Sequence, residues 1–247
     1  MSDVCVIPDR IIIAVTGEDA TTFLQGLVTN GPPTQGGCLS ALLTPQGKIL
    51  FEFTLIKSDD GYVLAAHSDA SEALIKRLKL YRLRARVGIE ASPKLKLLSD
   101  NRIAEAEFNA ELNSSYHERR IHAGVPQWGS DFGSNEVFPM DVNFDLLNGI
   151  DYKKGCFVGQ EVASRMKRKG DARKRTLIAK FDGEAPEKGA AVTAGDSTLG
   201  TIMSGVDGAA LALIRLDRWS AARDDGREIL AGIRPITLTT PTYMDSE

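Results

Sequence analysis

The chain has 247 residues, of which 43% are hydrophobic and 26% charged, and this balance is typical of a folded protein with one large or two smaller domains and excludes a mainly disordered chain. The formal charge of −3 favours neither nucleic acid nor a membrane as a partner. No apolar run approaches the roughly 18 to 20 residues of a bilayer span, and residues 1–10 lack the pattern of a signal peptide, so we expect a cytoplasmic protein, or a mature form whose targeting segment is absent.

The first part of the chain predicts alternating strands and helices. Residues 10–16 form a β-branched run that Gly17 ends, and residues 48–57 are apolar on both faces, which predicts an interior strand. In chain order we expect strands at residues 10–16, 39–44, 48–57, 62–66, 84–90 and 94–98, and helices from 18 to about 28 and from about 69 to 82. For residues 99–125 we predict only mixed loops and short elements.

The last part of the chain predicts a separate β-rich domain. Beyond Arg173, short runs of β-forming residues are separated by Gly, Asp and Pro, a spacing typical of a small antiparallel barrel or sandwich. We therefore expect an α+β chain in which residues 1–170 form one domain and residues 171–247 a second. The boundary falls in the most basic stretch of the chain, and a charged segment between two folded units often lines a cleft.

The positive charge is concentrated in two segments. Residues 153–175 contain nine basic and two acidic residues, and residues 76–86 contain six basic residues and no acid. Without these two segments the chain has a formal charge of −16. This asymmetry favours an anionic partner bound locally, although two solvated helix faces would give the same pattern. For residues 76–86 we expect the solvated face of a helix.

The segment around Cys156 carries the densest chemical signal. Two lysines precede it, glycines lie on both sides of it, and a helix is expected from about residue 158 to 167. The glycines permit a positive φ or a close approach, and a helix N-terminus with nearby cations favours an anion or a thiolate. A small buried thiol among tightly packed glycines would show the same residues. No histidine is spaced for a Cys-His pair, so we expect no acyl-transfer nucleophile.

The cysteines and histidines show no metal-ligand pattern. Cys5, Cys38 and Cys156 are far apart and form no CxxC motif, so the sequence predicts neither a disulfide framework nor a zinc site. We expect no metal site, and we treat Cys5 and Cys38 as bystanders.

Several segments of the chain resemble one known family. KGCFVGQE at residues 154–161, with SRMKRKG and ARKR downstream, resembles the signature of the YgfZ branch of the folate-binding YgfZ/GcvT family. Upstream segments are similar to the same branch in the same order: FLQGLVTN at 23–30, LLTPQGKILFEF at 42–53, YRLRARV at 81–87 and FPMDVNFDLLNGI at 138–150. The resemblance implies an aminomethyltransferase-like, folate-binding α+β domain followed by a small C-terminal β-barrel.

The resemblance also implies a binding site for tetrahydrofolate or a derivative. Asp141 takes the position of a carboxylate that grips the pterin N–H groups in a fork, and its alternative role is the N-cap of a short helix over residues 142–147. Lys154 is the first choice for the anionic glutamyl tail. The other expected cofactor contacts lie in and after the signature: Lys153, Gly155, Gly159, Gln160, Glu161 and Arg165. Solvated surface charge is sufficient to explain Lys167, Arg168, Lys169 and residues 173–175.

The acid–base residues of the related transferases are incomplete in this chain. Phe51 and Gly31 stand where those enzymes carry acids, and Glu52 either substitutes for one of them or is simply exposed. The resemblance therefore implies a protein that is not a classical enzyme. It implies a protein that binds tetrahydrofolate and supports iron–sulfur cluster assembly or repair and, through it, tRNA-modifying enzymes. Cys156 is its expected functional thiol. The alternatives are a folate-dependent aminomethyltransferase or amine demethylase, and a scaffold that has lost the ligand.

The resemblance implies two kinds of partner: folate, and iron–sulfur proteins or their assembly machinery. A protein partner or a second copy of the chain is needed because one cysteine cannot hold a four-ligand cluster by itself. We expect no membrane partner. A small polyanionic cofactor explains the lysines more economically than nucleic acid does.

Overall fold

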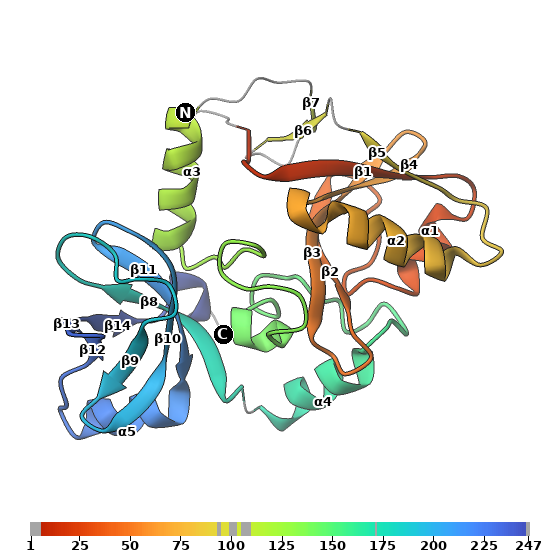
Figure 1. Ribbon diagram of the computed structural model, residues 1–247. Helices are drawn as coiled ribbons and strands as arrows, with labels where there is room; N and C mark the ends of the chain where they lie inside the picture. Colours follow the sequence, from red (N-terminus) through yellow and green to blue (C-terminus); the bar gives the residue numbers. More distant parts are fainter. Residues whose placement is uncertain (1–5, 93–94, 99–102, 105–109, 171, 246–247) are drawn as a thin grey trace. The chain divides into compact units, whose positions relative to one another are not determined.

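The computed structural model describes residues 6–92, 95–98, 103–104, 110–170 and 172–245 (Figure 1). The chain forms two compact units: unit 1 comprises residues 1–116 and 148–162, and unit 2 comprises residues 117–147 and 163–247. The chain therefore enters unit 2 twice, and the division into sequence domains at residue 170 remains a prediction. No helix among the described residues is both long and apolar enough to cross a membrane.

A five-stranded antiparallel sheet forms the centre of unit 1, with the strand order β2-β3-β4-β1-β5. Its strands are β1 (Arg10–Thr16), β2 (Gly37–Leu43), β3 (Ile49–Ser58), β4 (Gly61–His67) and β5 (Gly88–Ser92). β3 lies between β2 and β4 and is largely buried along its length, as expected for a strand that is apolar on both faces. The prediction of an interior strand is confirmed.

Two helices accompany this sheet: α1 (Ala20–Gln25) and α2 (Ser71–Arg82), which follows a short 3₁₀ turn, η1 (Ser68–Ala70). α2 buries Leu74 and Leu78 and lies against β1 and β5 (Figure 1). The short strands β6 (Lys96–Leu97) and β7 (Ile103–Ala104) pair with each other. The strand expected at 84–90 begins only at Gly88, because turns closed by Ala85 N–H on Arg82 and by Val87 N–H on Ala85 precede it.

Unit 2 contains a seven-stranded antiparallel sheet in the order β13-β12-β9-β10-β11-β8-β14, which curls into a barrel (Figure 1). The strands are β8 (Lys174–Lys180), β9 (Ala191–Ala194), β10 (Ser197–Val206), β11 (Ala209–Arg215), β12 (Leu230–Ala231), β13 (Arg234–Pro235) and β14 (Thr237–Thr239). Leu177, Val192, Leu199 and Ile214 share one buried core, against which the half-buried Trp219 of α5 (Leu216–Asp224) packs. The predicted C-terminal barrel is confirmed.

The remaining helices are α3 (Ala110–His122), α4 (Gln160–Lys169) and the 3₁₀ turns η2 (Pro139–Val142) and η3 (Thr242–Met244). α4 lies close to its expected position, whereas α3 falls where only short elements were predicted. The helix expected over residues 142–147 does not form. Pro139 begins η2 instead, and Asn143, in the left-handed region with φ 57°, ends it.

Candidate functional site

The segment before the Cys156 signature is hydrogen-bonded to the chain between α1 and β2. The Asn30 side-chain amide donates to the carbonyl of Asn148 at 2.6 Å, and the Thr29 hydroxyl donates to the carbonyl of Gly149 at 2.7 Å. The backbone N–H of Asp151 donates back to the Thr29 carbonyl at 3.0 Å. These bonds join residues more than 100 positions apart in the sequence and fix the start of the signature loop within unit 1.

Lys154 and Gln25 form a reciprocal pair that anchors the first side of the loop. The Gln25 side chain donates from Nε2 to the Lys154 carbonyl at 2.6 Å, and the Lys154 ammonium donates to the Gln25 carbonyl. Gln25 is the last residue of α1, so its carbonyl lies at the negative end of that helix and suits a cation. The ammonium also lies 5.0 Å from the centroid of the Phe157 ring. Burial lowers the pKa of Lys154 to about 8, while Asp151 acts in the opposite direction.

Phe157, Gly159 and Gln160 anchor the second side of the loop. The Phe157 side chain is buried, and the Gln160 carboxamide oxygen accepts the Phe157 N–H at 3.3 Å. Gly159 has φ +79°, and a Cβ at this position would lie 2.5 Å from the Thr44 carbonyl oxygen and 2.9 Å from Leu43 Cβ. Only glycine permits this approach to the turn between β2 and β3. Gly159 therefore serves packing.

Cys156 lies between the two anchors and faces solvent. It is a free, exposed cysteine, which excludes the alternative of a small buried thiol. Its neighbour Gly155 has φ +100°, and nothing lies within 4 Å of a Cβ built there. Lys154 and Phe157 thus hold the chain on either side while the thiol projects from the loop. Such an arrangement presents a sulfur nucleophile or metal ligand to another molecule.

Three further charged residues of the predicted site are exposed. Lys153 is exposed, and its backbone N–H donates to Asp151 Oδ1 at 2.8 Å. Glu161 is exposed in the first turn of α4, and Arg165 is exposed on the part of α4 that belongs to unit 2. Gln25, Thr29 and Asn30 were not predicted as site residues, although FLQGLVTN contains all three. That motif was the available signal.

Asp141, the candidate pterin carboxylate, belongs to unit 2. It is half-buried within η2, and its Oδ2 accepts the backbone N–H of Phe138 at 2.9 Å. Its own carbonyl accepts the Thr176 hydroxyl at 3.0 Å. Asp141 therefore closes the turn that begins at Pro139, and the alternative role as N-cap of a helix over residues 142–147 is wrong.

Glu52 is not an exposed strand residue. Its carboxylate, 5% exposed, accepts two hydrogen bonds from Arg10 Nη2, at 3.0 and 3.2 Å. The Arg10 guanidinium also donates to the Ala65 carbonyl at 3.4 Å. Glu52 is thus the buried partner of Arg10, and the pair joins β3 to β1.

Of the other two cysteines, Cys38 lies among the described residues and Cys5 does not. Cys38 is half-buried, its thiol lies 3.7 Å from the Gly31 carbonyl oxygen, and burial raises the pKa of this thiol to about 11. Cys5 lies outside the described residues. Within the described ranges, no group of three or more His, Cys, Asp or Glu side chains is arranged to hold a metal ion.

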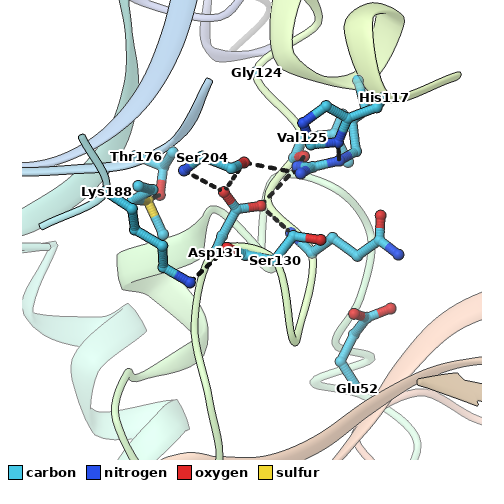
Figure 2. Close-up of polar contacts among 12 residues, drawn as sticks. Glu52, His117, Gly124, Val125, Ser130, Asp131, Thr176, Lys188 and Ser204 are labelled. Atoms are coloured by element: carbon cyan, nitrogen blue, oxygen red, sulfur yellow. Dashed lines mark hydrogen bonds and ion pairs between the residues drawn. The ribbon is translucent and has the colours of Figure 1, made fainter. Parts of the chain in front are cut away.

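Unit 2 carries a buried polar network centred on Asp131 (Figure 2). Asp131 Oδ2 accepts Arg120 Nη1 at 2.6 Å and the Gln127 N–H at 2.8 Å, while Oδ1 accepts both the N–H and the hydroxyl of Ser204. Arg120 Nε also donates to His117 Nδ1 at 3.2 Å, and burial followed by the Arg120 charge lowers the pKa of His117. The buried carboxylate accepts four hydrogen bonds and the guanidinium donates to four acceptors, so the network stabilises unit 2.

Arg175 is also part of the interior of unit 2. Its guanidinium forms a fork with the Asp145 carboxylate, at 2.6 and 2.9 Å, and donates to the Met140 carbonyl at 3.0 Å. The expectation that residues 173–175 are all solvated surface charge is therefore wrong for Arg175, because a bidentate partner compensates its burial. Arg173 and Lys174 are exposed, as expected.

Comparison with known proteins supports the fold assignment. Residues 173–246 match a family model described as the CAF17 C-terminal β-barrel domain. The glycine cleavage system aminomethyltransferase T from Bartonella henselae superposes with a TM-score of 0.73 at 15% identity, over 97% of this chain and 85% of that chain. The fold is that of an aminomethyltransferase with a C-terminal β-barrel. The predicted α+β fold class is confirmed.

Two relatives carry a named function. The chain is 30% identical over 236 residues to the iron–sulfur cluster assembly factor IBA57 homolog, mitochondrial, of Neurospora crassa, covering 72% of this chain and 54% of that protein. It is 26% identical over 267 residues to the human iron–sulfur cluster assembly factor IBA57, mitochondrial, covering 83% of this chain and 75% of that protein. The chain thus spans about half the length of the first relative. Because both relatives are named as mitochondrial, the expectation of a cytoplasmic protein is wrong.

Proposed function

We propose that this protein supports the assembly or repair of iron–sulfur clusters, with Cys156 as the thiol that contacts the cluster or its carrier. The observation that carries the proposal is the exposed Cys156 thiol on a loop anchored by Lys154 on one side and by Phe157 on the other. The chain is also similar to proteins named as iron–sulfur cluster assembly factors, and this similarity supports an iron–sulfur cluster as the group that the thiol contacts. Assignment to the YgfZ branch, and support of tRNA-modifying enzymes through their clusters, belong to the same proposal.

The chemistry of one thiol limits what the protein does alone. Iron–sulfur clusters are held by several thiolates, so Cys156 shares the cluster with cysteines of a partner or of a second copy of the chain. An anchored loop lowers the ordering cost when the partner binds, because the thiol is already presented. The exposed Lys153 ammonium lies nearby in sequence and favours an approaching anionic cluster.

Tetrahydrofolate or a derivative is the proposed ligand. Lys154 has three N–H donors, of which the Gln25 carbonyl takes one, so the ammonium suits a carboxylate of the glutamyl tail. By its position in FPMDVNFDLLNGI, Asp141 offers a carboxylate to the pterin N–H groups, and the Phe138 N–H also donates to it. Each residue therefore suits its ligand group while keeping a structural partner, and each is to be tested by itself.

Aminomethyl transfer is the less favoured function. Glu52, the one acidic residue expected to substitute in that reaction, is buried against Arg10. Formation of methylene-tetrahydrofolate from an aminomethyl donor, with loss of turnover in Glu52→Gln, would favour the transferase instead.

The Cys156 proposal is tested in a strain that lacks the gene. The strain is complemented with the wild type, Cys156→Ala, Cys156→Ser or the matched control Cys38→Ala, and the activity of a [4Fe–4S] enzyme is measured in extracts with equal protein levels. We expect the wild type and Cys38→Ala to restore the activity and both Cys156 variants to fail. Full rescue by Cys156→Ala would exclude the thiol from the function.

Folate binding is tested separately by calorimetry with purified protein and tetrahydrofolate. Wild-type binding that weakens in Lys154→Met or Asp141→Asn supports the ligand assignment, with Lys188→Met as a surface control in unit 2. Absence of heat with the wild type would reject folate as a ligand and leave the Cys156 test unaffected.

A further inference from the structure

The end of α2 carries two exposed leucines in a group of cations. We define the α2 patch as Lys76, Arg77, Lys79, Leu80, Arg82, Leu83 and Arg84, all of which are exposed. Leu80 is 64% exposed and Leu83 is 88% exposed. Among the described residues, Ile233 is the one further large hydrophobic residue that is exposed to a similar degree. Burial of apolar surface is favourable, so two neighbouring leucines that remain in water suggest a surface covered by a partner.

Helix geometry places the cations beside the leucines. Residues three and four positions apart are neighbours on a helix surface, so Lys76 and Arg77 flank Leu80. Leu83 follows the last residue of the helix and lies between Arg82 and Arg84 in the chain. The segment contains no acidic residue, and the opposite face of α2 is buried through Leu74 and Leu78. The end of α2 therefore combines two exposed leucines with exposed cations and no acid.

Leu83 has a backbone conformation that glycine would adopt with less strain. It follows the last residue of α2 with φ 44° and ψ −104°, in a turn that the Ala85 N–H closes on the Arg82 carbonyl at 2.7 Å. A turn of this kind favours glycine at that position because a Cβ is strained there. The fold nevertheless carries a leucine, and directs most of its side chain to solvent.

The turn is held in place from its other end. The Arg86 N–H donates to Asp19 Oδ2 at 2.8 Å, and the Arg86 guanidinium lies 2.6 Å from Glu18 Oε1. Arg86 is therefore compensated within unit 1 and is not counted in the patch. The five cations of the patch are exposed.

We propose that the α2 patch docks unit 1 on an anionic lipid surface, with Leu80 and Leu83 entering the interfacial layer and the flanking cations contacting lipid phosphates. Charge complementarity requires an anionic partner, and the leucines require one with an apolar layer next to the charge. A nucleic-acid backbone offers no apolar layer to aliphatic side chains. A protein partner would need an apolar socket bordered by acids and fitted to both leucines, whereas an anionic lipid surface offers the apolar layer and the charge without a fitted site. The proposal revises the expectation of no membrane partner.

The test is co-sedimentation of the full chain with vesicles of phosphatidylcholine alone or of phosphatidylcholine with one third phosphatidylglycerol. We expect binding only to the anionic vesicles and release at high salt, because exposed charges are screened. Leu83→Gly removes the leucine and suits the positive φ, so it should keep the thermal midpoint of the wild type while weakening vesicle binding by about tenfold. Ile233→Ser, which removes an equally exposed apolar side chain outside the patch, should bind as the wild type does.

Three outcomes would overturn the proposal. They are no binding of the wild type to anionic vesicles, equal binding by Leu83→Gly and the wild type, and equal weakening by Ile233→Ser. A single-stranded oligonucleotide provides the remaining arm. If it binds the wild type and Leu83→Gly alike while neither protein binds vesicles, the cations serve nucleic acid and the lipid proposal fails.

Discussion

Replacement of Gly159 by alanine tests whether the loop that presents Cys156 depends on close packing. The new Cβ would lie 2.5 Å from the Thr44 carbonyl oxygen and 2.9 Å from Leu43 Cβ, so the backbone of the β2–β3 turn must move. Gly155 offers a matched control, because it also has a positive φ, +100°, but a Cβ there meets nothing within 4 Å.

The expected magnitudes follow from this contrast. A positive φ costs an alanine about 1–2 kcal/mol at either position. Overpacking adds about 1–3 kcal/mol at Gly159 alone. Gly155→Ala should therefore destabilise by about 1–2 kcal/mol and Gly159→Ala by about 2–5 kcal/mol.

Urea unfolding of both variants, followed by fluorescence, measures the difference directly. If the two variants lose the same free energy of unfolding, the steric reasoning about Gly159 is refuted, and only the backbone conformation matters.

Three further predictions concern stability. Arg120→Met leaves Asp131 buried without its cation and should lower the free energy of unfolding by about 3–5 kcal/mol in urea titrations; a loss below about 1 kcal/mol would contradict a structural network. Tyr243→Phe removes the 2.6 Å hydrogen bond to the Gly124 carbonyl and should cost about 1–3 kcal/mol by the same assay, and an unchanged midpoint would mean that water replaces the hydroxyl. The pKa of Lys154 is about 8 in the folded protein against 10.5 for the free side chain, so the unfolded state binds more protons between these values and stability rises with pH across that window. In Lys154→Met the free energy of unfolding should rise less between these pH values than it does in the wild type. Parallel pH profiles of the urea midpoint for the wild type and Lys154→Met would contradict the lowered pKa of Lys154.

The sequence predicts candidate site residues only where they stand together in one continuous segment. KGCFVGQE identified Cys156 and its glycines because the unusual residue types stand next to one another. The partner of Lys154 was not found, because Gln25 lies 129 positions away and no local pattern joins them. For the same reason Glu52 was read as a solvent residue or a catalytic acid, when Arg10, 42 positions away, is its partner.

Buried charges show the same limit in unit 2. Arg175 stands in a run of basic residues, and a run of this kind predicts solvated charge. Its burial depends on Asp145, which comes from the segment after η2. α3 was also missed, because residues 110–122 are mostly polar and carry little apolar periodicity.

The sequence by itself determined the local elements and the type of fold. β-branched runs, the stripe of leucines in α2 and the regular turns after Arg173 specify strands, a helix and a barrel, because each depends on neighbours a few positions away. The tertiary structure alone decided which charges are paired, which thiol faces solvent and which leucines remain uncovered. Those properties depend on contacts between distant segments, which form only when the chain has folded.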